Sequence, residues 1–115
     1  MKVKEMETAL GLQLLTKDLS EDALNRELSG GYVSDLLSNV MGQSEEDMVW
    51  ITMQGHKNVA AAASLMGIAA VVVAGGAPVA DETLSKAAQN DVAVFSSAAS
   101  AFELAGKLYC LGVGR

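Results

Sequence analysis

Apolar residues recur three or four positions apart in several parts of the chain, the spacing that places them on one face of a helix. The clearest set lies at positions i, i+3, i+4 and i+7 and consists of Val59, Ala62, Ala63 and Met66. The same spacing predicts helices over residues 1–10 and 81–90, and a last helix that follows residues 96–97 and ends at Gly112.

Short apolar runs separate these helical stretches. They predict strands over residues 12–15, 27–33, 48–53, 68–73 and 92–95. Gly30 and Gly31 interrupt the second run and predict a bulge or a close strand crossing. Trp50 and Met53 lie in the third run, which has little polarity, and are predicted core residues.

A further helix is predicted between the strands 27–33 and 48–53. Ser34 or Asp35 is its expected N-cap, because serine and aspartate side chains accept hydrogen bonds from the first free amides of a helix. Gly42 is its expected C′ residue, the position just past the end of the helix. The polar stretch 16–26 predicts no more than a helical turn near residues 20–22.

Strands that alternate with helices predict an α/β fold: an open, mainly parallel β-sheet with helices on both faces, in three α/β/α layers. The 115 residues are expected to form one domain, residues 1–115, with a packed core, since 50% are hydrophobic and 19% charged. Residues 59–80 carry no charge, but Gly67, Gly75, Gly76 and Pro78 interrupt them, so a transmembrane helix is not expected.

Eight Lys and Arg against fourteen Asp and Glu give a net charge of −6. An acidic surface repels nucleic-acid backbones and anionic membranes, so neither is an expected partner. Cys110 is the only cysteine, which excludes an intrachain disulfide and a cysteine-based metal site, and neither a metal nor a cofactor is predicted. The first residues lack the apolar run of a signal peptide, so a cytoplasmic location is predicted.

Polar residues and glycines follow the predicted parallel strands, where ligands bind in open sheets of this kind. The candidate ligand-binding residues are Ser34, Asp35, Gly55, His56, Lys57, Asn58, Gly75, Gly76 and Ser96. Lys57 would attract an anionic group, and the two adjacent glycines would allow close approach of a ligand. Each position also has a simpler interpretation: Asp35 as a helix cap, His56 as a solvated side chain, and the glycine pair as a turn.

Sequence motifs for catalysis are absent. There is no P-loop and no GxGxxG string, and one histidine and one cysteine at distant positions do not form a nucleophilic pair. The predicted function is therefore that of a non-catalytic regulatory or interaction domain, not an enzyme, which senses a small anionic or nucleotide-like ligand at the carboxyl ends of the strands. The alternative is a small enzyme or phosphate-transfer accessory protein that uses His56.

Four segments together resemble the DRTGG-domain family, in particular its short stand-alone members: residues 30–41, 49–59, 70–76 and 100–109. The family is similar in fold to the N-terminal domain of HPr kinase/phosphorylase. The resemblance implies a regulatory module, commonly dimeric, with a protein partner of hydrogenase-linked or signalling type, since such members are encoded near iron-only hydrogenase and anti-sigma-type ATPase genes. The eponymous Asp-Arg-Thr-Gly-Gly string is absent, and residues 55–58 hold its place.

The alanine-rich, weakly charged helices also predict a homodimer, because small side chains let two subunits approach closely. The expected contact surface is the helix over residues 58–66 or the segment 30–33, where Tyr32 would be an aromatic anchor. The simpler interpretation is that the alanines pack on the sheet of their own chain.

Overall fold

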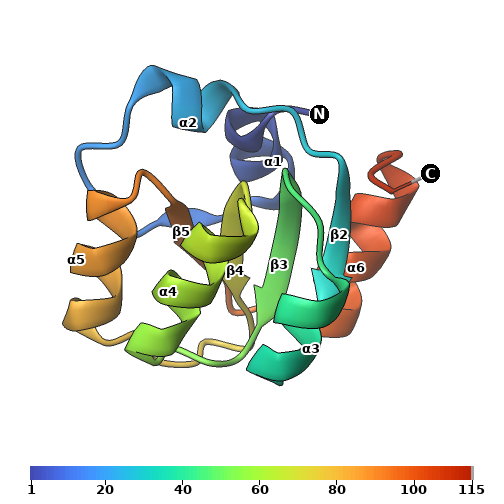
Figure 1. Ribbon diagram of the computed structural model, residues 1–115. Helices are drawn as coiled ribbons and strands as arrows, with labels where there is room; N and C mark the ends of the chain where they lie inside the picture. Colours follow the sequence, from blue (N-terminus) through green and yellow to red (C-terminus); the bar gives the residue numbers. More distant parts are fainter. Residues whose placement is uncertain (115) are drawn as a thin grey trace.

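The computed structural model describes residues 1–114, which form six helices and a five-stranded sheet (Figure 1). Along the chain the elements are α1 (Val3–Leu10), β1 (Gln13–Leu14), α2 (Glu21–Asn25), β2 (Gly30–Val33), α3 (Leu37–Gln43), β3 (Met48–Thr52), α4 (Lys57–Met66), β4 (Ala70–Val73), α5 (Asp81–Gln89), β5 (Ala93–Ser96) and α6 (Ala101–Cys110).

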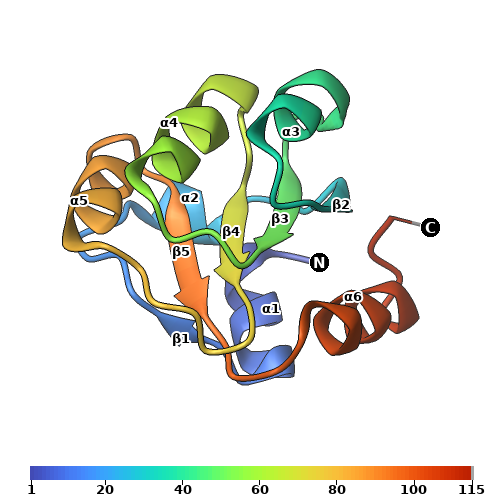
Figure 2. The ribbon, with the colours of Figure 1, turned by 90° about the horizontal axis from the view of Figure 1, so that it is seen from below.

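The strands lie in the order β1-β5-β4-β3-β2. Strands β2 to β5 are parallel neighbours, and β1 pairs antiparallel with β5. Helices α3, α4 and α5 connect successive parallel strands and lie on one face, whereas α1 and α6 lie on the other (Figure 2). The predicted three-layer α/β/α fold with an open, mainly parallel sheet is thereby confirmed.

The central strand β4 and its neighbour β3 are buried on both faces. Val49 and Ile51 pack in the cluster that contains α1 and α6 residues, and Trp50 packs in the cluster that contains α3, α4 and α5 residues. Burial on both faces explains why residues 48–53 include few polar side chains. Met53 was predicted to be core, which is wrong: it follows the end of β3 and is 52% exposed.

The glycine pair in β2 does not form a bulge. Gly30 and Gly31 pair in unbroken register with Met48 and Val49. The other predicted option, a close strand crossing, is not found either: a Cβ placed on Gly30 would lie 3.6 Å from Cε of Met48 and 3.8 Å from the Cα of Gly114, which are ordinary contact distances. The strand is shorter than predicted, since residues 27–29 precede it.

Both predicted ends of α3 are wrong. Its N-cap is Leu36, and neither Ser34 nor Asp35 caps it. Gly42 lies inside the helix, whose last residue is Gln43. Ser44 is the C-cap, and its backbone N–H still donates to the carbonyl oxygen of Val40. The buried Ser44 hydroxyl donates to the same carbonyl, so the helical turn is completed without a left-handed glycine.

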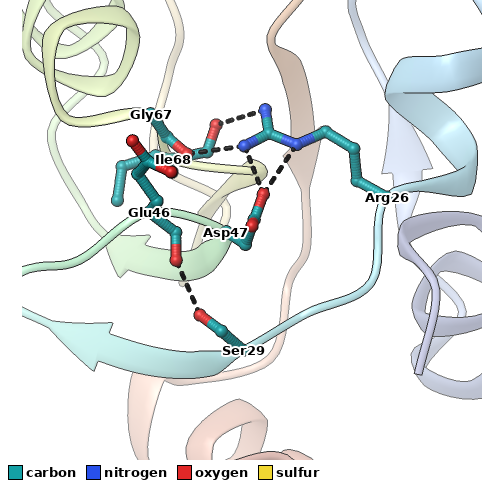
Figure 3. Close-up of polar contacts among 6 residues, drawn as sticks. All are labelled: Arg26, Ser29, Glu46, Asp47, Gly67 and Ile68. Atoms are coloured by element: carbon teal, nitrogen blue, oxygen red, sulfur yellow. Dashed lines mark hydrogen bonds and ion pairs between the residues drawn. The ribbon is translucent and has the colours of Figure 1, made fainter.

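At the edge where the parallel strands begin, Arg26 joins three segments (Figure 3). Its Nε and Nη2 donate to Oδ1 of Asp47 at 3.1 and 2.6 Å. Its Nη2 and Nη1 also donate to the carbonyl oxygens of Gly67 and Ile68, at 2.6 and 3.2 Å. One guanidinium therefore links the connection between α2 and β2 to the residues that precede β3 and β4.

The uncharged stretch 59–80 is divided between α4, β4 and the loop that follows β4. Within residues 1–114, no helix has both the length and the apolar character needed to cross a membrane.

Candidate functional site

The carboxyl ends of β2, β3, β4 and β5 share one edge of the sheet, the lower edge in Figure 1, because these strands are parallel. The structure therefore brings the loops that carry the nine candidate residues to one rim. Within that rim it divides them into two groups, one beside α3 and α4 and the other beside β4 and β5.

Asp35 fastens the loop after β2 to the end of β3. Its Oδ1 accepts a hydrogen bond from the hydroxyl of Thr52 at 2.8 Å and another from the backbone N–H of Met53 at 2.7 Å. Thr52 is buried, whereas Asp35 is exposed to solvent. Asp35 therefore fixes the position of the loop after β2 relative to the end of β3.

Ser34, next to Asp35, accepts one hydrogen bond from its own loop and one from a side chain of β3. Its hydroxyl oxygen accepts from the backbone N–H of Leu36 at 3.1 Å, and its carbonyl oxygen accepts from Nε1 of Trp50 at 2.8 Å. The first bond lies within the turn between β2 and α3, and the second ties this turn to β3.

His56 is the N-cap of α4, and its Nδ1 accepts a hydrogen bond from the backbone N–H of Asn58 at 3.2 Å. This capping contact requires a neutral ring with its proton on Nε2. Both side chains are exposed at the amino end of a helix of ten residues, where the helix dipole favours negative charge.

Lys57 follows His56 and lies 3.8 Å from a carboxylate oxygen of Glu82, at the start of α5. Both side chains are about half exposed, at 48% and 59%. Such a surface pair contributes little to stability, and a ligand with a stronger negative charge can compete for the lysine.

Gly55 lies at the tightest contact in the rim. A Cβ placed on it would be 1.9 Å from the carbonyl oxygen of Pro78 and 2.8 Å from the Cα of Val79. The carbonyl oxygen of Gly55 accepts from the Thr83 hydroxyl at 2.7 Å and from the Ala80 N–H at 3.1 Å. Gly55 therefore docks the loop after β3 onto the loop after β4.

Gly75, Gly76 and Ser96 form the second group. The chain passes to one face of the sheet after β4 and to the other after β5, and ligands often bind at such a point. Here the crevice is closed by the chain itself, because the N–H groups of Gly75 and Gly76 donate to the carbonyl oxygens of Ala99 and Ser97, both at 2.8 Å. Both glycines have positive φ, so they form a turn whose amides are already engaged.

Ser96 is half-buried in β5, where it pairs with Gln13 of β1 and Val73 of β4. It is therefore separated by β4 and β3 from the loop that holds Asp35.

The rim contains a cleft of about 430 Å³ between the amino ends of α3 and α4, and we refer to it as the α3–α4 cleft. It is lined by Asp35, Leu36, Leu37, Gln54, His56, Asn58 and Val59. Three of the nine candidate residues, Asp35, His56 and Asn58, line it.

Gln54 and the three apolar residues of the cleft were not among the sequence candidates. Gln54 belongs to the polar loop 54–58, so its polarity was a usable signal. Leu36 is 61% exposed, whereas a leucine at the start of a predicted helix is expected to be buried. Among residues 1–114, no group of three or more His, Cys, Asp or Glu side chains is placed to hold a metal ion.

No family model matches the sequence, and no curated protein matches it either. Among solved structures, the chain is similar to the CBS and DRTGG domains of the regulatory region of Clostridium perfringens pyrophosphatase, complexed with the activator diadenosine tetraphosphate. The TM-score is 0.75 at 13% identity, and the match covers 93% of this chain and 45% of that one. At this identity the likeness concerns the fold, and it supports the DRTGG-like fold that the sequence resemblance implied.

Proposed function

We propose that this chain is a non-catalytic regulatory domain that binds a nucleotide-like ligand in the α3–α4 cleft. The observation that carries the proposal is the meeting of Asp35, Gln54, His56 and Asn58 around one open space of about 430 Å³. Small-molecule sites have volumes of about 300–1,000 Å³ and combine apolar walls with a few convergent polar groups. Leu36, Leu37 and Val59 supply the apolar part of that wall.

The chemistry of the cleft favours a ligand with both hydrogen-bond donors and negative charge. The Asp35 carboxylate accepts hydrogen bonds and repels anions, which suits the hydroxyl groups of a ribose or the amino group of a base. The amino end of α4 and the nearby Lys57 suit a phosphate group. A nucleotide carries both kinds of group, whereas inorganic phosphate carries only one.

The similar pyrophosphatase regulatory region is described in complex with the nucleotide activator diadenosine tetraphosphate. A shared fold does not transfer a ligand, but it supports nucleotides as the first compounds to test. That likeness also supports a regulatory role for this chain.

The absence of catalysis is part of the proposal. Oδ1 of Asp35 is engaged by Thr52 and Met53, and Nδ1 of His56 is engaged by the backbone of Asn58. Of the two groups that could form an acid–base pair, Asp35 therefore links two loops of the rim and His56 caps α4. The alternative, phosphate transfer through His56, predicts phosphorylated protein or ATP turnover that disappears in a His56→Asn variant, which keeps a helix-capping side chain.

A thermal-shift screen followed by calorimetry, with AMP, ATP, diadenosine tetraphosphate and inorganic phosphate, tests the ligand. A compound at 100 times its dissociation constant adds about 2.7 kcal/mol of stability, or about 10 °C in Tm for a domain of this size. Gln54→Ala should weaken binding, whereas Gln89→Ala, which removes an exposed glutamine at the other end of α5, should not.

Glu82→Gln removes the carboxylate beside Lys57 and should tighten the binding of a phosphate-bearing ligand, more so at low salt. Equal effects of Gln54→Ala and Gln89→Ala, or no shift with any of the four compounds, would contradict the proposed site.

We also propose that the domain self-associates. In α4, the helix expected to mediate this association, Ala60, Ala62 and Ala63 are buried within one chain, whereas Ala61 is exposed. A cytoplasmic location and a protein partner of hydrogenase-linked or signalling type stay predictions from the sequence.

A further inference from the structure

Helix α6 presents an apolar stripe to solvent. Leu104 and Leu108 are buried against the sheet, but Phe102 is 89% exposed and Tyr109 is 59% exposed. Phe102, Gly106 and Tyr109 are spaced i, i+4 and i+7 and therefore lie on one face of the helix, which we call the outer stripe. Helix α6 lies on the outside of its layer, next to α1 (Figure 2).

Gly106 lies in the middle of α6, where glycine is less favourable than alanine. A Cβ placed on Gly106 would meet no atom within 4 Å, so packing inside this chain does not require a glycine. Gly42, in α3, also faces open space, but it lies next to the end of its helix. A glycine at the centre of an exposed helix face permits the close approach of a second helix.

The charges beside the outer stripe are self-complementary. Glu103 and Lys107 are both exposed, and within residues 1–114 the Lys107 ammonium forms no ion pair. An antiparallel pair of α6 helices related by a two-fold axis near residues 105–106 would place Phe102 against the partner's Tyr109. The same axis would place Glu103 near the partner's Lys107, and symmetry would repeat both contacts.

A groove beside the outer stripe can receive the aromatic anchor. It has a volume of about 260 Å³ and lies between α6 and the unpaired edge of β2. Tyr32, Val33, Ala105 and Tyr109 are among the residues that line it. Because Tyr109 borders the groove, the arrangement above brings the partner's Phe102 to its entrance.

We propose that two copies of this chain associate through the outer stripe of α6 as an antiparallel helix pair. The inference rests on the self-association proposed above and names its surface. A helix of ten residues is about 15 Å long and buries less than a standard protein interface. The dimer should therefore dissociate reversibly, with a dissociation constant on the order of micromolar or weaker.

Sedimentation equilibrium across micromolar to millimolar concentrations measures the association. The mass of the wild-type chain should rise from 11.9 kDa toward twice that value. Phe102→Ala should raise the dissociation constant about tenfold or more, as expected for an aromatic anchor. Leu65→Ala, which removes a side chain of α4 that is 69% exposed, is the matched control and should leave it unchanged.

A charge reversal tests the antiparallel register. Glu103→Lys and Lys107→Glu should each weaken association, and the two substitutions combined in one chain should restore it, because the pair is re-formed with opposite polarity. Circular dichroism confirms that each variant is folded.

The outcomes separate the two proposals. If the wild-type chain is monomeric at every concentration, self-association is wrong. If it dimerises but neither Phe102→Ala nor the charge reversals change the dissociation constant, self-association stands and the α6 surface is wrong. The nucleotide titrations concern the α3–α4 cleft and are decided independently.

Discussion

Gly55→Ala should be the most damaging small substitution in the rim. The added Cβ would lie 1.9 Å from the carbonyl oxygen of Pro78 and 2.8 Å from the Cα of Val79, and both are backbone atoms that cannot rotate away. Relief of such an overlap costs about 1–3 kcal/mol. Movement of the loop also lengthens the hydrogen bonds from Thr83 and Ala80 to the Gly55 carbonyl, which contribute about 1 kcal/mol each.

The expected loss is therefore about 3 kcal/mol, which corresponds to a fall in Tm of about 12 °C. Urea unfolding followed by circular dichroism measures it. Gly42→Ala is the matched control, because it adds the same methyl group inside α3, where a Cβ would meet no atom within 4 Å. It should leave stability unchanged or raise it by up to about 1 kcal/mol. Similar stabilities for the two variants would refute the steric argument.

Two further predictions concern polar contacts outside the rim. Arg26→Met removes every hydrogen bond of the guanidinium shown in Figure 3 and leaves two backbone carbonyls without this donor. The free energy of unfolding, measured by urea titration, should therefore fall by about 1.5–3 kcal/mol. A loss below about 0.5 kcal/mol would show that water replaces the side chain. Hydrogen bonds from the hydroxyl and the backbone N–H of Ser20, with a smaller effect of Arg26, hold the pKa of Asp91 below its ordinary value of 3.8. Since the folded-state pKa is the lower one, this stabilisation is present above pH values near 4 and is lost as the pH falls through the folded-state pKa. Asp91→Asn should therefore be less stable than the wild type at neutral pH, and the difference should shrink in acid; a difference that is constant with pH would contradict this assignment.

The periodicity of the sequence was sufficient to locate nearly all helices and strands. Stripes such as Val59, Ala62 and Ala63 are local patterns, and they mark the buried face of α4 as the structure has it. The apolar runs 48–53 and 68–73 likewise indicated strands with both faces covered. The predicted ends of the helices were less accurate. Asp35 has the residue type of a helix cap, but its carboxylate accepts hydrogen bonds from Thr52 and Met53.

The sequence also placed polar loops after the parallel strands, but it could not show which of them leave an open space. The turn at Gly75 and Gly76 and the loop around His56 look equally suited to a ligand. In the folded chain, carbonyl groups of residues 97 and 99 occupy the two glycine amides, whereas Gln54 and His56 line the open cleft.

Element type and fold class were therefore determined by the sequence alone, because the pattern of apolar positions within about ten residues decides which face of each element must be buried. Only the tertiary structure decided that β1 lies at the edge beside β5, that Gly55 must be a glycine, and that the cleft forms between α3 and α4. Each of these features depends on contacts between residues distant in the chain: Gln13 with Ser96, Gly55 with Pro78, and Asp35 with Thr52. Such contacts depend on which strands and loops become neighbours in the folded sheet, and no local pattern of residues encodes that arrangement.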